Sequence, residues 1–119
     1  MNVLRTVPML RIFDESMAKA FYTDFLGFEV EWEHRFEPNL PVYMQARRGE
    51  CVLHLTGHHG DCCPGAKVFR EVAGLEEYVE GLRRAPFFGV NPAIQDAPWG
   101  SRVCEVVDPF GNRLLFNER

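Results

Sequence analysis

The chain has 119 residues, 46% of them hydrophobic and 25% charged, with a formal net charge of −4 at pH 7. This length and composition predict one soluble globular domain whose core needs no disulfide or metal, and no apolar run is long enough to span a membrane. The acidic balance, with basic pairs only at Arg47–Arg48 and Arg83–Arg84, disfavours nucleic acid as the main partner and favours a neutral or cationic ligand.

Residues 1–16 contain an apolar patch that Arg5 and Arg11 interrupt, and no small-residue cleavage site follows it. We therefore expect no secretory signal and a cytoplasmic protein. In that compartment the four cysteines are expected to be free thiols. Cys62 and Cys63 are adjacent in the chain, and adjacent cysteines rarely meet the geometry of a bridge to each other.

A strand-like segment at 6–13 precedes the first predicted helix, which Asp14 caps and which ends at Gly27. A second strand-like segment at 67–72 precedes a helix over 74–84, with acidic residues in its first turn and arginines in its last. In both helices the apolar residues recur at helical spacing along one stripe. The residues of these stripes are Ala18, Phe21, Tyr22 and Phe25 in the first helix and Leu75, Tyr78, Val79 and Leu82 in the second.

Three extended segments follow each helix, joined by turns in which Gly49 and Gly111 supply the positive φ that a hairpin needs. These segments are 28–36, 42–48 and 51–56 in the first half and 91–95, 101–107 and 113–118 in the second. The chain therefore reads as a βαβββ module at about 1–58, a loop at 58–65 and a second βαβββ module at about 66–119. We expect one α+β domain whose curved sheets form a cup with the helices outside, and a cup interior that needs a ligand, a partner or apolar filling.

Three stretches of the chain stand out, "VPMLRIFDESMAKAFYTDFLGF", "APWGSR" and "VVDPFGNRLLF", and their most specific parts are the helix end "FYTDFLGF" and the turn "DPFGN". Together they resemble the bleomycin resistance proteins of the glyoxalase superfamily, whose members are also called vicinal oxygen chelate proteins. The resemblance implies paired βαβββ modules. For the drug-binding branch it also implies a homodimer with two clefts between the subunits.

The enzymes of this superfamily hold a divalent metal with four side chains, and the resemblance places these positions at Val7, His54, Lys67 and Leu115. Valine and leucine have no donor atoms, and a lysine ammonium repels a cation. A single histidine cannot hold a catalytic metal, which needs about three protein ligands. We therefore expect a binding protein without a cofactor. A metal-dependent glyoxalase or dioxygenase with non-standard ligands is the alternative.

Trp99 lies just before a strand, where it is either an aromatic residue at the edge of the core or a stacking platform in the cleft. The resemblance implies the second role, and stacking contributes about 0.5 to 1.5 kcal/mol beyond area burial. Strand alternation from Trp99 puts Ser101 and Glu105 on the same face. The Glu105 carboxylate either attracts a cationic ligand or pairs with Lys67 or an arginine across the sheet, and the sequence leaves both open.

His54 and Thr56 share one face of the segment 51–56. A lone strand histidine is more often a hydrogen-bonded structural group than a ligand, so a binding role for His54 rests on the resemblance. Phe69 occupies the position of an aromatic residue in the family's cleft. If that strand phase holds, Arg70 points toward the helix layer, which is unfavourable for a guanidinium group and leaves the phase open.

The stretch "HLTGHHGDCCPG" brings several possible metal ligands close in sequence, but it lacks the paired spacings of structural zinc motifs, and its glycines and proline indicate a loop. The side chains in this stretch that can bind a metal are His54, His58, His59, Asp61, Cys62 and Cys63. Whether the loop binds a metal stays open.

These observations predict a protein that sequesters a flat, cationic small molecule, such as a bleomycin-type antibiotic, in a cleft at the interface of a homodimer, without chemical turnover. A subunit or scaffold with a filled, apolar cleft is a third possibility, which the mixed polar and aromatic character of the inner faces disfavours. The candidate ligand-binding residues are Trp99, Glu105, His54, Thr56, Phe69 and Ser101.

Overall fold

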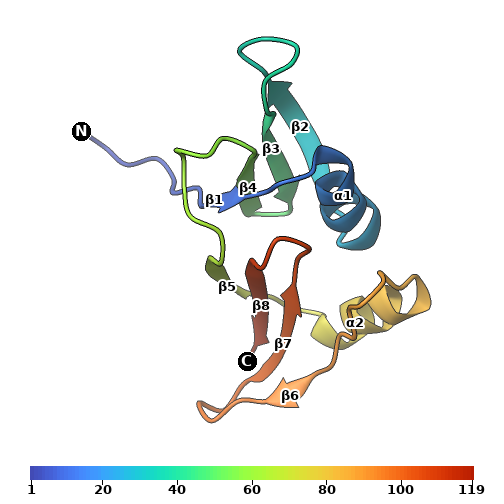
Figure 1. The fold of residues 1–119 in the computed structure, drawn as a ribbon. Coiled ribbons are helices and arrows are strands. Elements are labelled where there is room, and N and C mark those ends of the chain that lie inside the picture. Colours follow the sequence, from blue (N-terminus) through green and yellow to red (C-terminus); the bar gives the residue numbers. More distant parts are fainter.

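The computed structural model describes all residues, 1–119, and divides them into two modules with the same order of elements. The first module contains a four-stranded sheet of order β1-β4-β3-β2, in which β1 runs parallel to β4 and the other pairs are antiparallel (Figure 1). Its elements are β1 (Met9–Arg11), α1 (Glu15–Lys19), η1 (Ala20–Phe25), β2 (Glu29–His34), β3 (Tyr43–Arg48) and β4 (Cys51–Thr56).

The second module repeats this topology in a sheet of order β5-β8-β7-β6, with β5 parallel to β8. Its elements are β5 (Lys67–Glu71), α2 (Leu75–Arg84), β6 (Gln95–Asp96), β7 (Arg102–Val107) and β8 (Arg113–Glu118). The predicted pair of βαβββ units is confirmed. The two sheets share no hydrogen-bonded strand pair within the chain, so each forms its own half of the molecule.

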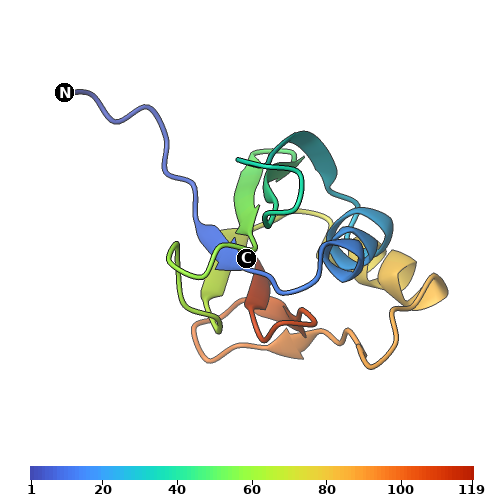
Figure 2. The same cartoon turned by 45° about the horizontal axis from the view of Figure 1, so that its top comes forward.

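Two strands are shorter than the sequence pattern predicts. The segment 6–13 forms a strand only at Met9–Arg11, and the segment 91–95 contributes only Gln95 to the two-residue β6. Pro8 has no N–H to donate and contributes only its carbonyl, which accepts from the His54 N–H at 3.0 Å. Pro92 likewise lacks a donor near the start of its segment. Residues 1–4 extend away from the body of the protein, with Leu4 almost fully exposed (Figure 2).

The first helix begins where Asp14 accepts a hydrogen bond from the Met17 N–H at 2.8 Å, as the sequence predicts. It widens into the π-helical stretch η1, where the Leu26 N–H bonds the Phe21 carbonyl oxygen. The π-helical stretch places three aromatic side chains in the core, and the helix stops at Gly27 with φ +84°. The three aromatic residues are Phe21, Tyr22 and Phe25.

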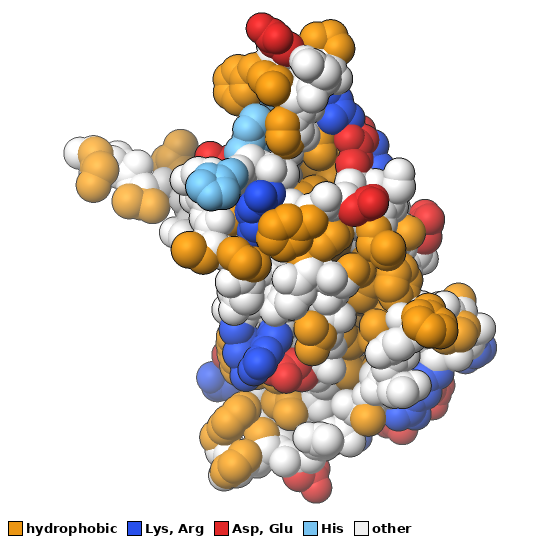
Figure 3. Space-filling view, in the orientation of Figure 1, with side chains coloured by type: hydrophobic (Ala, Val, Ile, Leu, Met, Phe, Trp, Pro, Cys, Tyr) orange, Lys and Arg blue, Asp and Glu red, His pale blue; other side chains and the backbone are white.

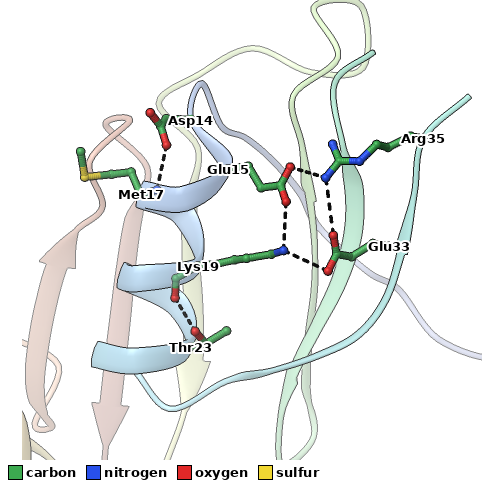
Figure 4. A network of polar contacts seen from close by, with 7 residues as sticks. All are labelled: Asp14, Glu15, Met17, Lys19, Thr23, Glu33 and Arg35. Atoms are coloured by element: carbon green, nitrogen blue, oxygen red, sulfur yellow. Dashed lines mark hydrogen bonds and ion pairs between the residues drawn. The ribbon is translucent and has the colours of Figure 1, made fainter. Parts of the chain in front are cut away.

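An ion-pair network ties this helix to strand β2 (Figure 4). The Lys19 ammonium lies 2.9 Å from the Glu15 carboxylate and 3.0 Å from that of Glu33, and Arg35 forms ion pairs with both carboxylates. The hydrogen bonds from Arg35 and Lys19 lower the pKa of Glu15. All four side chains are about one-third exposed, so each pair adds little stability by itself, and the network mainly fixes the helix orientation.

Both helices cover the same side of the molecule, and one continuous core lies between them and the two sheets (Figure 1). Buried polar contacts join the modules across this core. The Tyr22 hydroxyl donates to Asp108 at 2.6 Å, and the Asn112 amide donates to the Arg11 carbonyl at 2.9 Å. Asn112 belongs to the "DPFGN" turn, so this turn joins the two halves as well as closing a hairpin.

We call the sheet faces turned away from the helices the open faces. Hydrophobic side chains reach the surface over both modules (Figure 3), and on the open faces they include Met9, Trp32, Phe69 and Trp99, each at least 43% exposed. The two open faces therefore carry apolar side chains that no helix of the chain covers. No helix is both long enough and apolar enough to cross a membrane.

Candidate functional site

The open face of the second sheet presents an exposed tryptophan whose position is fixed by a buried partner. Trp99 is 60% exposed, and its indole Nε1–H donates to the Asn117 side-chain oxygen at 2.9 Å. Asn117 is only 2% exposed and donates from its amide to the Ser101 hydroxyl at 3.4 Å. The indole ring is therefore held in one orientation while its face stays open to solvent.

Phe69 completes this surface from the neighbouring β5. It is 52% exposed and borders the same hollow, about 350 Å³ in volume, as Trp99 and Ser101. The structure thus brings together three of the six predicted site residues. The residues lining the hollow are Phe69, Glu71, Trp99, Gly100, Ser101, Asn117 and Arg119.

Strand alternation explains why these side chains share a face. In β5 the side chains of Lys67, Phe69 and Glu71 are exposed, while Arg70 points toward the helix layer. The predicted phase of this strand is therefore the observed one, including the unfavourable position of Arg70. Asn117 was not predicted as a site residue, although its alternation with Phe116 in β8 would have placed it on the open face.

Glu105 lies on the same open face, but its carboxylate already forms an ion pair with Lys67. Its carboxylate is 2.9 Å from the Lys67 ammonium, the cross-sheet pairing that the sequence left open. The two side chains are 36% and 52% exposed, so solvent screens the pair. A cationic ligand would have to compete with Lys67 for this carboxylate.

His54 lies on the open face of the first sheet, inside a hydrogen-bonded chain of side chains. Its Nδ1 is 2.6 Å from the Tyr43 hydroxyl, and its Nε2 is 2.9 Å from the Gln45 side-chain oxygen. Because that oxygen can only accept, Nε2 carries the proton and Nδ1 accepts from Tyr43. Burial lowers the pKa of His54, and the nearby Arg5 lowers it further, so the ring is neutral at neutral pH.

Trp32 also belongs to this face, and sequence reasoning missed it. Its ring stacks on Tyr43 with centroids 6.0 Å apart and an interplanar angle of 8°. Regular alternation would put Trp32 on the same side as Val30, toward the helix layer. A β-bulge between these two residues instead pairs Trp32 with Gln45 and turns the indole to the open face.

Thr56 does not offer the exposed contact that its strand position predicts. It is fully buried, because the loop that follows β4 folds over it. Its hydroxyl donates to the Asp61 carboxylate at 2.7 Å and accepts from the His58 backbone N–H at 3.0 Å. Thr56 thus anchors the loop.

The side chains do not suit a catalytic metal at the four positions that the superfamily's enzymes use. Lys67 is paired with Glu105, Val7 and Leu115 have no donor atom, and His54 has both ring nitrogens engaged. Nowhere in the structure do three or more His, Cys, Asp or Glu side chains gather as a metal site would require. The loop histidines and cysteines therefore do not form such a group either.

The sequence of the chain matches a family model described as "Glyoxalase superfamily protein" over residues 1–119. Bleomycin resistance proteins from Geobacillus stearothermophilus and Staphylococcus aureus are 25% identical to it over 132 aligned positions, which cover 96% of each chain. The resemblance that the helix end and the terminal turn indicate is thus found along nearly the whole chain.

Solved structures with the same fold include a bleomycin-binding protein in complex with bleomycin, with a TM-score of 0.75, 20% identity and coverage of 98% of this chain and 99% of that one. A bleomycin-binding protein from Streptomyces verticillus, in complex with copper(II)-bleomycin, has a TM-score of 0.72, 25% identity and coverage of 100% and 98%. With the family model spanning every residue, this chain belongs to the glyoxalase superfamily.

Proposed function

We propose that this protein binds and sequesters a small, flat, antibiotic-type molecule on the open face of its second sheet, without transforming it. The observation that carries the proposal is Trp99, an exposed indole fixed by a hydrogen bond to buried Asn117 and placed beside Phe69. A ligand ring that stacks on an indole already held in place loses little conformational entropy in ordering it.

The relatives support a drug-type ligand. The curated relatives are named for bleomycin resistance, and two similar structures contain bleomycin bound to a protein of the same fold. The donor-poor side chains at the metal positions support binding without turnover, because Lys67 and Leu115 cannot coordinate a catalytic cation.

The binding cleft, in this proposal, closes only when two copies of the chain associate. Within one chain the hollow beside Trp99 is small, and its aromatic residues are half exposed. The open face of the other sheet carries a second aromatic pair, Trp32 and Tyr43. A second copy would cover these apolar side chains and add a wall to the hollow. Light scattering after size-exclusion chromatography should then give about twice 13.7 kDa, and a single species of 13.7 kDa at micromolar concentration would contradict the dimer.

The preferred ligand, we further propose, is cationic, but the preference is weak. Glu71 borders the hollow and Glu105 lies on the same open face, and each already has a partner, Lys67 for Glu105 at 2.9 Å and Arg119 for Glu71 at 3.1 Å. Both pairs are open to solvent, so a cation can exchange with the basic partner at small cost. Stacking then supplies most of the affinity, and the charge contribution weakens as salt rises.

Calorimetric titration with bleomycin tests the site. Trp99→Ala should weaken binding by about 1 to 3 kcal/mol, the range for losing a large apolar contact. Phe88→Ala is the matched control, because Phe88 is a fully exposed aromatic residue outside this surface. Equal affinity of Trp99→Ala and the parent would place the site elsewhere.

A further inference from the structure

A second and larger hollow, about 890 Å³ in volume, lies between the two modules. We call it the inter-module pocket. It is bordered by the end of η1, the β3–β4 turn, β5 and the first turns of α2, and most of its lining is hydrophobic. Strand β5 separates it from the hollow beside Trp99, since Phe69 and Glu71 border both. Its apolar walls include Leu26, Phe28, Val68, Val72, Leu82 and Phe116.

One positive charge in this apolar lining has no partner. The Nε, Nη1 and Nη2 atoms of Arg70 are each accessible to less than 1 Å² and form no hydrogen bond. The guanidinium carbon instead lies over aromatic rings, 4.9 Å from the centroid of Phe116 and 5.8 Å from that of Phe28. A buried guanidinium normally has a carboxylate or carbonyl partner, because losing its hydration without one is unfavourable.

The neighbouring protein groups do not supply the missing negative charge. Cys51, Tyr22 and Tyr78 are the ionisable groups that act most strongly on Arg70, and burial raises the pKa of each of the three, which keeps them neutral. Three glutamates border the pocket, but no ion pair joins any of them to Arg70. These glutamates are Glu50, Glu71 and Glu77.

We infer that the inter-module pocket is a second binding site, which takes an amphipathic anion. Its anionic head, a carboxylate, sulfonate or phosphate, pairs with the planar fork of Arg70, and its apolar body lies along the hydrophobic walls. Because the nitrogens of Arg70 are sealed from solvent, the head group reaches them by displacing adjoining lining side chains. Binding therefore moves side chains that line the pocket, and it does not involve Trp99.

The probe for this site is decanoate, used below its micelle concentration, with decanol as the neutral analogue. The parent should bind decanoate at least tenfold more tightly than decanol. Arg70→Met should remove that difference. Arg113→Met is the matched control, a strand arginine that is exposed and lies outside the pocket, and it should bind decanoate like the parent.

Backbone amide chemical shifts of the parent locate the site without any variant. Decanoate should shift the resonances of Val68–Gly74 and Gly27 and leave the Trp99 indole unchanged. Equal affinity for decanoate and decanol, no binding of decanoate, or shifts confined to the Trp99 surface would overturn the inference. Arg70→Met should also unfold at a higher temperature than the parent, because it removes an uncompensated buried charge. If this variant does not fold, the chemical shifts and the comparison of decanoate with decanol, both measured on the parent, still show whether the inter-module pocket binds an anion.

Discussion

On the open face of the first sheet the polar and aromatic side chains hydrogen-bond and stack with one another. On the open face of the second sheet the rings of an aromatic pair have no stacking partner. His54, Tyr43 and Gln45 form a continuous hydrogen-bonded chain, and Trp32 stacks on Tyr43. On the second sheet the aromatic pair makes a single hydrogen bond, from the indole N–H of Trp99, and the rings of Trp99 and Phe69 remain exposed. The first face should therefore contribute to stability and the second to binding.

Removing the histidine at the centre of the first face should have the larger effect on stability. His54→Ala removes the partner of the Tyr43 hydroxyl and leaves the Gln45 amide oxygen with only the long bond from Arg5, so the free energy of unfolding should fall by about 1 to 2 kcal/mol. Trp99→Ala should lower it by less than about 1 kcal/mol, because the indole is mostly exposed. Urea denaturation measures both. A larger loss for Trp99→Ala than for His54→Ala would reverse the assignment of the two faces.

The same histidine should make stability depend on pH in a defined direction. Burial lowers the pKa of His54 in the folded protein below the ordinary value of 6.5, so the unfolded chain binds more protons between those two values. The contribution of His54 to the stability of the folded protein is fully present above pH 6.5. It is lost as the pH falls through 6.5 toward the lowered pKa of the folded state. Thermal unfolding from pH 7.5 to 5 should therefore show a steeper decline for the parent than for His54→Ala.

His59 offers the control for this measurement, because it is exposed in the loop after β4 and makes no side-chain hydrogen bond. His59→Ala should keep the decline of the parent. A decline that His59→Ala removes and His54→Ala retains would assign the pH dependence to the loop instead of the first face.

The smallest effect is expected at Glu105. Glu105→Gln breaks a solvent-exposed pair with Lys67, so the free energy of unfolding should change by no more than about 1 kcal/mol. Affinity for a cationic ligand should fall slightly, and only at low salt, while a neutral ligand of the same shape should bind unchanged. Glu80→Gln, on the exposed side of α2, is the charge-matched control. A large, salt-independent loss for Glu105→Gln would mean that the bound ligand displaces Lys67 and buries the carboxylate.

Alternation and turn chemistry predicted the parts of the second face that lie on regular strands. The phase of β5, which exposes Phe69, follows from the pattern even though it buries Arg70. Asn117 was overlooked because the pattern shows which face it shares but not that its amide reaches the Trp99 indole. Only the folded turn at 97–101, where the Ala97 N–H bonds the Ser101 carbonyl, brings the two together.

The first face was harder to predict because local irregularities override its pattern. A bulge in β2 reverses the side of Trp32, and the loop after β4 covers Thr56. Neither feature has a signal in the strand periodicity, since each depends on how neighbouring segments pair and fold back. Pro8 similarly shortens the first strand below the length that its apolar residues suggest.

The indole N–H resonances of the two tryptophans report on the two faces separately, since Trp99 lies on the second face and Trp32 on the first. In a titration with bleomycin, with Trp32→Phe used to assign the signals, the Trp99 resonance should move in step with the calorimetric saturation. The drug recovered from the complex should keep its original mass. A Trp99 resonance that stays in place while bleomycin binds, or a drug whose mass has changed, would contradict the account.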